Sequence, residues 1–180
     1  MTAALEADPA LLADRVLVLL GEGWHHGVVG IIAARITERY GKPCIVFSMD
    51  GEEAKGSGRS VKGFSLFQAI ASCQELLLSF GGHELAAGVG LKTEQIPAFR
   101  KKINEFAAGL ERMPVPQLSL TCKMKPDQLD LDKVNLLSAL EPFGTGNPAP
   151  VFGLFHMRLD NVSPVGGGRH LRLSVSRDGV

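Results

Sequence analysis

The chain has 180 residues, 45% of them hydrophobic, and a formal net charge of zero when histidine is neutral. This length allows one sizeable core or two small ones, and zero net charge excludes a global field that would draw the protein onto nucleic acid or an anionic membrane. The longest apolar run, Val16 to Leu20, is far too short to cross a bilayer, and residues 1–14 lack the basic start of a signal peptide. We therefore expect no membrane partner.

Cysteine usage indicates a reducing compartment. The three cysteines, Cys44, Cys73 and Cys122, are odd in number, widely spaced and set among apolar residues. This pattern favours free thiols over a disulfide framework, and no Cys or His stands at metal-ligand spacing from any of them. A cytoplasmic protein is expected.

Strand and helix signals alternate through the first half of the chain. The apolar run at 15–20 predicts a strand, and apolar residues at helical spacing over 27–40 predict a helix that stops at a Gly-Lys-Pro sequence. Residues 43–50 are typical of a second buried strand, which the Asp50-Gly51 pair turns into a glycine- and serine-rich stretch.

A second helix is predicted where Ser65 precedes Gln68 by three residues, the spacing of a capping box. We expect this helix to end at Gly81-Gly82 and His83 to start the next strand. An amphipathic helix then follows over 98–110. The order of elements predicts an α/β fold class, with a mainly parallel sheet flanked by helices, over residues 15–111.

The composition changes at Pro114 and Pro116, which cannot continue a helix and form a stiff linker over 112–116. Beyond the linker, one short helix and glycine-punctuated antiparallel strands predict a smaller β-barrel-like domain over 117–180. Because an alternating strand runs into a turn signal at 178–180, we expect this domain to be truncated.

The glycines at 21, 23 and 27 stand between a strand and a helix and imitate a dinucleotide-binding fingerprint. The imitation is inexact, because Trp24 and His25 stand where the backbone would have to approach a pyrophosphate. The alternative is that Trp24 anchors the core and the histidines cap the start of a helix.

The stretch "KGSGRS" combines features of an anion site. Ser57 and Ser60 offer hydroxyls, Gly58 lets the backbone approach a ligand, and Arg59 offers a planar fork suited to phosphate. The cations Lys55 and Lys62 flank the stretch with no acid between them. The alternative is a solvated Gly-Ser turn.

The stretch "FGGHELAAGVGL" places Gly81, Gly82 and His83 together between two predicted elements. A neutral histidine in either tautomer can donate a hydrogen bond to a phosphate. A structural histidine in an ordinary turn explains the same residues, so the residues alone leave both interpretations open.

Basic residues gather near the end of the second domain. Arg169, His170 and Arg172 lie in a stretch without acids, and phenylalanines earlier in the same domain, at 143, 152 and 155, offer stacking planes. Such a pattern suits a groove for single-stranded nucleic acid. A charged solvent face on a half-buried sheet is the alternative.

Four stretches, in this order, resemble the C-terminal half of the RecJ family, single-stranded-DNA-specific 5′ to 3′ exonucleases of the DHH phosphoesterase superfamily. They are "GEGWHHGVVGIIAARITERYGKPCIVFS", "AKGSGRSVKGFSLFQAI", "FGGHELAAGVGL" and "EPFGTGNPAPVF". The resemblance implies a DHH-associated substrate-binding domain over 15–111 and part of an oligonucleotide-binding (OB) domain over 117–180. Residues 1–14 would be the remnant of a linker to a catalytic domain that the chain lacks.

The family's catalytic centre is a pair of Mn²⁺ or Mg²⁺ ions held by Asp and His residues of an N-terminal DHH domain. The sequence lacks the Asp-His-His triplet, since Trp24 precedes the two histidines, and no acidic cluster accompanies it. We therefore expect no catalytic residue and no bound metal in this chain, and no hydrolysis by the chain alone.

The resemblance implies instead that the chain handles the substrate. Ser57, Gly58, Arg59 and Ser60 would line the pocket for the terminal 5′ phosphate, and Gly81, Gly82 and His83 would contact a nucleotide phosphate that faces the metals. Trp24 and His25 would border the same cleft, and Lys55, Lys62, Arg169, His170 and Arg172 would line a DNA groove. Expected partners are single-stranded DNA, the protein's own DHH domain and single-stranded-DNA-binding protein.

Two other functions remain open at this point. One is a stand-alone nucleic-acid-binding module, related to accessory domains of alanyl-tRNA synthetases. The other is part of an oligonucleotide or cyclic-dinucleotide phosphodiesterase, although the β-domain argues against it because a small substrate needs no groove that guides a strand.

Overall fold

The computed structural model describes residues 9–179. The chain divides into two compact units, one up to Pro116 and one from Gln117 onward. The predicted linker remnant lies partly outside the described residues, and its last residues include a short helix, α2 (Pro9–Ala13). No helix in the described range is long and apolar enough to cross a membrane.

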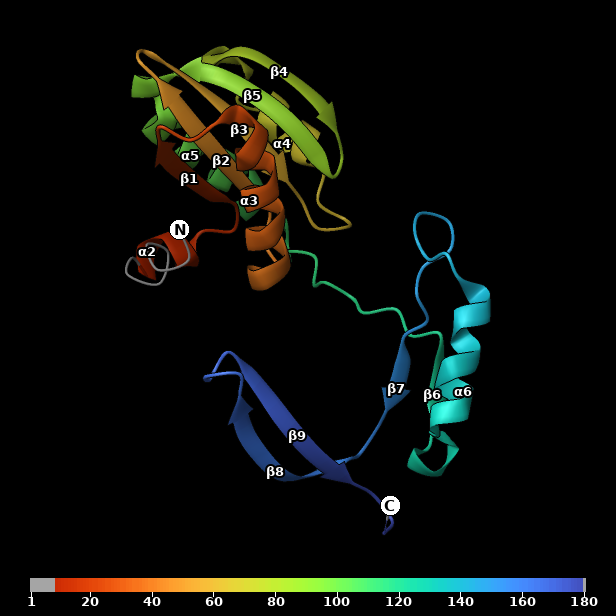
Figure 1. Cartoon of the computed structure of the whole chain (residues 1–180). Helices are drawn as coiled ribbons and strands as arrows, with labels where there is room; N and C mark the ends of the chain where they lie inside the picture. The colour runs from red at the N-terminus through yellow and green to blue at the C-terminus, as the bar shows by residue number, and fades with distance from the viewer. Residues whose placement is uncertain (1–8, 180) are drawn as a thin grey trace. The chain divides into compact units, whose positions relative to one another are not determined.

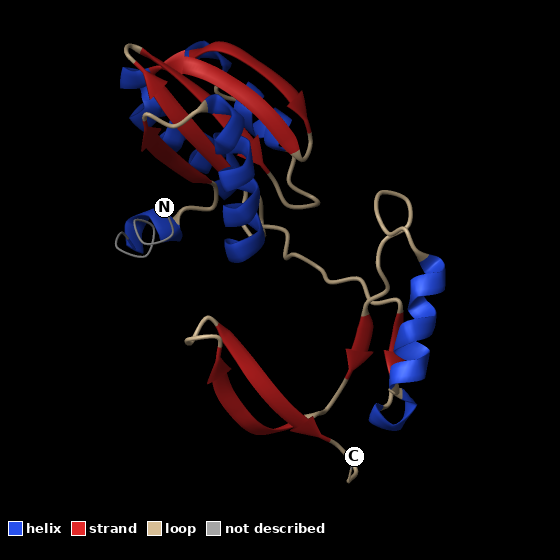
Figure 2. Ribbon diagram, viewed as in Figure 1, coloured by secondary structure: helices blue, strands red, loops and turns tan. Residues whose placement is uncertain are grey.

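The first unit is built on one mixed sheet (Figures 1 and 2). Its further elements are β1 (Leu17–Glu22), α3 (His26–Tyr40), β2 (Cys44–Asp50), β3 (Glu53–Arg59), α4 (Leu66–Ala71), η1 (Gln74–Leu76), β4 (Leu77–His83), β5 (Ala86–Lys92), η2 (Thr93–Gln95) and α5 (Ile96–Ala108). The five strands lie in the order β1-β2-β3-β5-β4.

The sheet is mainly antiparallel, so the expectation of a mainly parallel sheet is wrong, while a helix-flanked α/β fold is confirmed. Only β1 and β2 pair in parallel, through the crossover helix α3. The other three pairs are antiparallel. Two tight turns account for two of these pairs: Asp50 pairs with Glu53, and His83 pairs with Ala86, each across two residues. Hairpins this short can only join antiparallel strands.

Helices cover the two faces of the sheet unequally. On one face, α3 packs Val29, Ala33 and Ile36 against residues of β1 and β2, with Trp24 partly buried beside them. On the other face, α4 and α5 enclose the larger core, in which Phe47 of β2 meets Phe99 of α5 edge to face at 5.6 Å. Neither cluster places a helix against β4 and β5 on the face of the sheet that α3 covers.

The predicted second helix is shorter than expected. Ser65 does accept a hydrogen bond from Gln68 N, at 3.3 Å, so the predicted N-terminus is confirmed. The helix ends at Ala71, however, and Gly81-Gly82 belong to strand β4, which His83 ends instead of starting the next strand. The reason is that residues 77–83 find hydrogen-bonding partners along β5, and a short apolar run does not by itself distinguish a strand from a helix.

The second unit contains two small sheets and one short helix. Its elements are β6 (Cys122–Met124), η3 (Pro126–Gln128), α6 (Leu131–Leu136), η4 (Leu137–Leu140), β7 (Phe152–Leu154), β8 (Arg158–Val165) and β9 (His170–Ser176). The expected antiparallel pairing is confirmed for β8 and β9. By contrast, β6 and β7 run parallel, because α6 and a long loop bring the chain back to the end from which β6 started.

Candidate functional site

The stretch "KGSGRS" is a strand and not a turn, and the strand divides its residues between two faces. Successive side chains of a strand point to opposite sides, so Ser57 and Arg59 share the α3 face of β3. Gly58 is on the other face, where a Cβ would stand 2.7 Å from Leu66 Cδ2 of α4. Gly58 therefore makes room for the core, although its carbonyl oxygen still serves the site.

Arg59 is held along its own strand. Its Nη1 donates to Gly58 O at 2.8 Å and to Ser57 Oγ at 3.2 Å, and the Thr37 hydroxyl of α3 donates to the Arg59 carbonyl at 3.3 Å. None of the ion pairs found within residues 9–179 includes Arg59. The partly buried guanidinium keeps Nε and Nη2 as donors for an external anion.

The register of the sheet brings the second predicted motif onto the same face. Arg59 pairs with Ala86 of β5, which pairs in turn with His83 of β4. One step along, Gly88 stands between Ser57 and Gly81 in the same way. Residues directly opposite in adjacent strands point to the same side, so Arg59 and His83 flank a nearly side-chain-free floor.

Gly81 and Gly82 differ in what their lack of a side chain does. Gly81 is exposed, and a Cβ there would meet nothing within 4 Å. Gly82 has φ +142, and a Cβ there would overlap the Ala86 carbonyl oxygen. Gly82 thus serves the backbone, whereas Gly81 leaves open space above the sheet.

His83 is exposed and has a defined tautomer. Its Nδ1 accepts a hydrogen bond from Leu85 N at 3.3 Å, within the turn between β4 and β5. In the neutral ring the proton therefore resides on Nε2, which can donate to a ligand.

Three other predicted residues around this face have different environments. Ser60 donates its hydroxyl proton to Phe64 O at 2.8 Å, so that proton is committed to a turn of the chain. Lys55 is exposed on the same face as Ser57 and pairs with Gly90. Lys62 is exposed in the turn after β3. Of the four residues at 57–60, Ser57 and Arg59 are the two that present side-chain donors on the α3 face.

The segment before α3 supports its structural interpretation. His25 is the N-cap of α3, where its Nδ1 accepts from Gly27 N at 3.1 Å. Trp24 packs against the smaller core cluster, and a Cβ on Gly21 would overlap its indole. The glycine that imitates a dinucleotide fingerprint thus makes room for an aromatic ring.

The basic residues of the second unit lie on the β8–β9 hairpin. His170 and Arg172 alternate with Leu171 and Leu173, so the hairpin has one polar and one apolar face. Arg169 lies in the turn, where its Nε donates to Gly166 O at 3.2 Å. The three cationic or ionisable side chains are exposed, which fits either a nucleic-acid groove or a solvated face.

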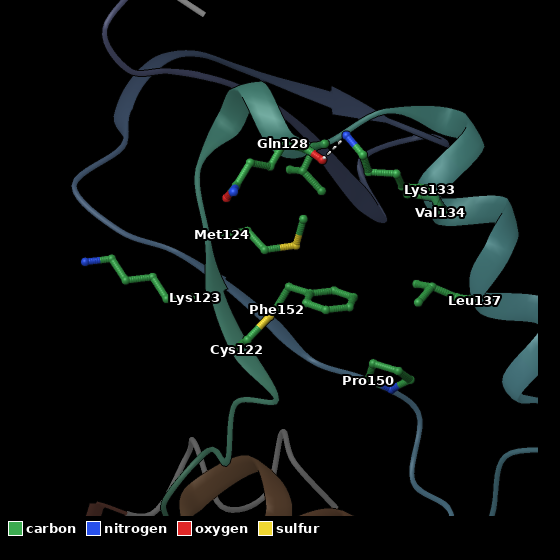
Figure 3. A pocket seen from close by; sticks show the side chains of 10 residues that line it. Cys122, Lys123, Met124, Gln128, Lys133, Val134, Leu137, Pro150 and Phe152 are labelled. Carbon is green, nitrogen blue, oxygen red and sulfur yellow. Dashed lines mark hydrogen bonds between the residues drawn. The ribbon is translucent and has the colours of Figure 1, made fainter.

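The second unit also contains a cavity of about 590 Å³ between α6 and the β6–β7 pair (Figure 3). Phe152 and Met124 point toward Leu137 across it, and Lys133 donates from Nζ to Gln128 O at 3.3 Å at its rim. Its lining is mainly apolar. No residue predicted as a site lies in this lining. Two lysines, Lys123 and Lys133, do lie in it, and Lys133 is paired with Asp130 at 2.6 Å.

A catalytic metal centre does not fit the residues described here. Among the side chains that the structure describes, no three from His, Cys, Asp or Glu come close enough together to hold a metal ion.

Sequence reasoning missed Gly30 and Gly88. A Cβ on Gly30 of α3 would lie 3.1 Å from both Arg59 Nη2 and Ser57 Oγ, and Gly88 forms the floor between Ser57 and Gly81. A glycine inside a predicted helix is a signal of close packing, but its partner becomes visible only after the sheet is assembled.

Family models match both units of the chain. The DHHA1 domain model matches residues 13–109, and the RecJ OB domain model matches residues 120–180.

Curated and solved proteins give the same result. The single-stranded-DNA-specific exonuclease RecJ of Bacillus subtilis is 33% identical over 93% of this chain, which spans 22% of that protein. Crystal structures of Thermus thermophilus RecJ with Mg²⁺ and with Mn²⁺ superpose with TM-scores of 0.75 and 0.76, at 35% and 34% identity. Each match covers 97% of this chain, and the chain covers 28% and 26% of the two crystallised chains. The chain thus spans about a quarter of the length of these relatives.

Proposed function

The chain belongs to the DHHA1 domain family, joined here to a RecJ-type OB domain, and on this premise we propose that it is the substrate-holding part of a single-stranded-DNA exonuclease. Relatives from Bacillus subtilis, Thermus thermophilus and Escherichia coli carry the name single-stranded-DNA-specific exonuclease RecJ. The chain binds a single strand and its 5′ phosphate. The hydrolytic centre, with Mn²⁺ or Mg²⁺, belongs to a DHH domain outside the described residues, in a protein that acts in DNA repair and recombination.

The observation that carries the proposal is the state of Arg59. A partly buried guanidinium normally has a carboxylate partner, because removing a charge from water is costly. Among the side chains that the structure describes, Arg59 has none, and its Nη1 hydrogen bonds, to Ser57 and Gly58, fix the plane of the fork. A phosphate is the natural counter-charge for such a pre-oriented fork.

The other residues of the face complete the proposed role. His83 Nε2 donates to a second phosphate oxygen or to the next phosphate, and Ser57 contributes its hydroxyl. The open floor at Gly81 and Gly88 lets the sugar-phosphate chain lie close to the backbone. These groups hold the strand in line, and fixed donors of this kind accelerate phosphoryl chemistry by positioning it.

The second unit is proposed to guide the strand. The polar face of the β8–β9 hairpin, with His170 and Arg172, binds phosphates without reading the sequence. The protein's own DHH domain and single-stranded-DNA-binding protein are its proposed protein partners, and the cytoplasm is its proposed location.

The proposal is tested by the affinity for a 5′-phosphorylated oligonucleotide relative to its 5′-hydroxyl form. Arg59→Ala should remove about 1.5–3 kcal/mol from binding of the phosphorylated strand, which is roughly 10- to 150-fold. The 5′-hydroxyl strand should lose much less. Arg112→Ala, an exposed arginine of the same unit, is the matched control and should change neither affinity. If Arg59→Ala lowers the affinity for both oligonucleotides equally, Arg59 does not bind the terminal phosphate.

A nuclease assay separates holding from hydrolysis. With Mn²⁺, the chain alone should bind the strand without cleaving it. Turnover that survives purification to remove contaminating nucleases would contradict the assignment of the metal centre to another domain.

A further inference from the structure

We infer that Gly30 of α3 is a positioning residue for Arg59, and that its missing side chain is what lets the guanidinium hold its phosphate-binding orientation. The inference rests on the proposed function, since it concerns how the proposed phosphate ligand is held. It adds a residue from a different element to the site.

The geometry is a close approach between a helix and a side chain. A Cβ on Gly30 would stand 3.1 Å from Arg59 Nη2, 3.1 Å from Ser57 Oγ and 3.7 Å from Arg59 Cζ. The first two distances are shorter than ordinary van der Waals contact, so an added methyl group would push at least one of the two side chains away by a few tenths of an ångström. Nη2 is also one of the two nitrogens, with Nε, that Arg59 keeps for a ligand, because its hydrogen bonds to Ser57 and Gly58 both come from Nη1.

Nothing in the backbone of α3 requires glycine at this position. Gly30 lies inside a regular helix of 15 residues and does not have a positive φ. In a helix interior glycine is the poorest choice after proline, and alanine would favour folding. The glycine is therefore explained by the space over Arg59 and Ser57.

Three contacts then define a slot for the arginine. Gly58 O and Ser57 Oγ accept hydrogen bonds from Nη1, and the backbone of Gly30 lies next to Nη2. The Thr37 hydroxyl fixes the Arg59 carbonyl from the same helix. The arginine thus loses little rotamer freedom on binding, which raises affinity through pre-organisation.

The test compares Gly30→Ala with wild type in two measurements, the preference for a 5′-phosphorylated over a 5′-hydroxyl strand and the melting temperature. We expect the preference to fall roughly tenfold, the equivalent of about one charged hydrogen bond. We expect the melting temperature to stay equal or rise, because the helix gains an alanine. In an Arg59→Ala background, Gly30→Ala should cause no further loss of preference, since coupled residues are non-additive.

Val28→Ala is the matched control. Val28 lies on the exposed side of α3, and its replacement also raises helix propensity. The preference of Val28→Ala for a 5′-phosphorylated strand should equal that of wild type. If Val28→Ala and Gly30→Ala both lose this preference, the loss comes from a general change in α3, and the inference is overturned.

A second background covers the case in which Gly30→Ala fails to fold. Arg59→Lys keeps the charge but lacks Nη2, and Ser57→Ala removes the second close contact, so Gly30→Ala should fold in a background that carries both changes. Unfolding in both backgrounds would assign Gly30 to packing of α3 on the sheet and overturn the inference.

The two failures are distinguishable. If Arg59→Ala abolishes the preference while Gly30→Ala, correctly folded, leaves it intact, the inference fails and the proposed function stands. If Arg59→Ala has no effect on the preference, the proposed function fails and the inference falls with it.

Discussion

Arg59 and His83 stand in one row of the sheet, on the same face and two strands apart, because both are paired with Ala86. Adjacent strands are about 4.8 Å apart, so the two Cα atoms are separated by roughly 10 Å. Two stretches that are distant in the sequence thereby lie on opposite sides of one proposed binding surface. The contribution of each side can be measured separately.

Replacing His83 should weaken strand binding without weakening the fold. His83 is exposed, and its one hydrogen bond within the described chain is accepted from Leu85 N. His83→Ala should lower the affinity for a 5′-phosphorylated strand about tenfold, by loss of one hydrogen bond to a charged group. Fluorescence anisotropy measures the affinity, and thermal unfolding should show little change. Unchanged affinity in a folded variant would show that His83 does not contact the strand.

The two adjacent glycines of β4 should respond oppositely to alanine. Gly81→Ala places a methyl group in open space and should leave the melting temperature nearly unchanged, while it lowers strand affinity by raising the floor. Gly82→Ala should destabilise the first unit by about 1–3 kcal/mol, because φ +142 strains an L side chain and the methyl group overlaps the Ala86 carbonyl. Calorimetry and anisotropy on both variants check this. A stable, binding-competent Gly82→Ala would contradict the assignment.

Arg172 and Arg158 offer a matched pair on the hairpin of the second unit. Arg158 is paired with Asp160 at 2.7 Å, whereas no ion pair among the described side chains contains Arg172. If Arg172 contacts a phosphate, Arg172→Ala should reduce the slope of log affinity against log salt concentration by about 0.7, the value for one contact on a single strand. Arg158→Ala should leave the slope unchanged. Equal slopes for Arg172→Ala and wild type would favour a solvated face.

Thiol reactivity should separate the three cysteines. Burial raises the pKa of the Cys44 thiol to about 12, and burial likewise raises the pKa of Cys73, partly offset by its hydrogen bond to Ser72. Cys122 is exposed. Because the thiolate is the reactive form, one thiol per chain should react rapidly with Ellman's reagent at pH 8, and Cys122→Ser should abolish that phase. Rapid reaction of a second thiol in the folded protein would show that a core cysteine is accessible.

Local chemistry explains why several features could be predicted from the residues. Ser65 and Gln68 indicated a helix N-terminus that the structure contains, and the run over 43–50 indicated a buried strand. Trp24 and His25 were interpreted either as ligand contacts or as core and cap, and the structure confirms the core and cap. Capping and burial depend on neighbours within a few residues, so the sequence contains the information.

The second motif shows where this reasoning stops. Gly81-Gly82 are typical of a helix end, yet they lie in a strand because β5 offers them partners. The predicted direction of the strands was wrong for a similar reason. A two-residue turn makes two strands antiparallel only if both flanking segments are strands, and the sequence did not show that residues 53–59 and 77–83 are strands.

By itself the sequence determined which residue types were available for an anion site, namely Arg59, Ser57 and His83, and in which order they occur. Only the tertiary structure decided that Gly58 faces the core and the Ser60 hydroxyl bonds to Phe64 O. It also decided that His83 lies in the same row of the sheet as Arg59, and that Gly30 of α3 lies against the Arg59 guanidinium. The physical reason is that side chains alternate along a strand while register and helix packing are set by long-range contacts. A linear motif therefore identifies the chemical groups of a site, and the register of the sheet decides which of its residues lie on the same face.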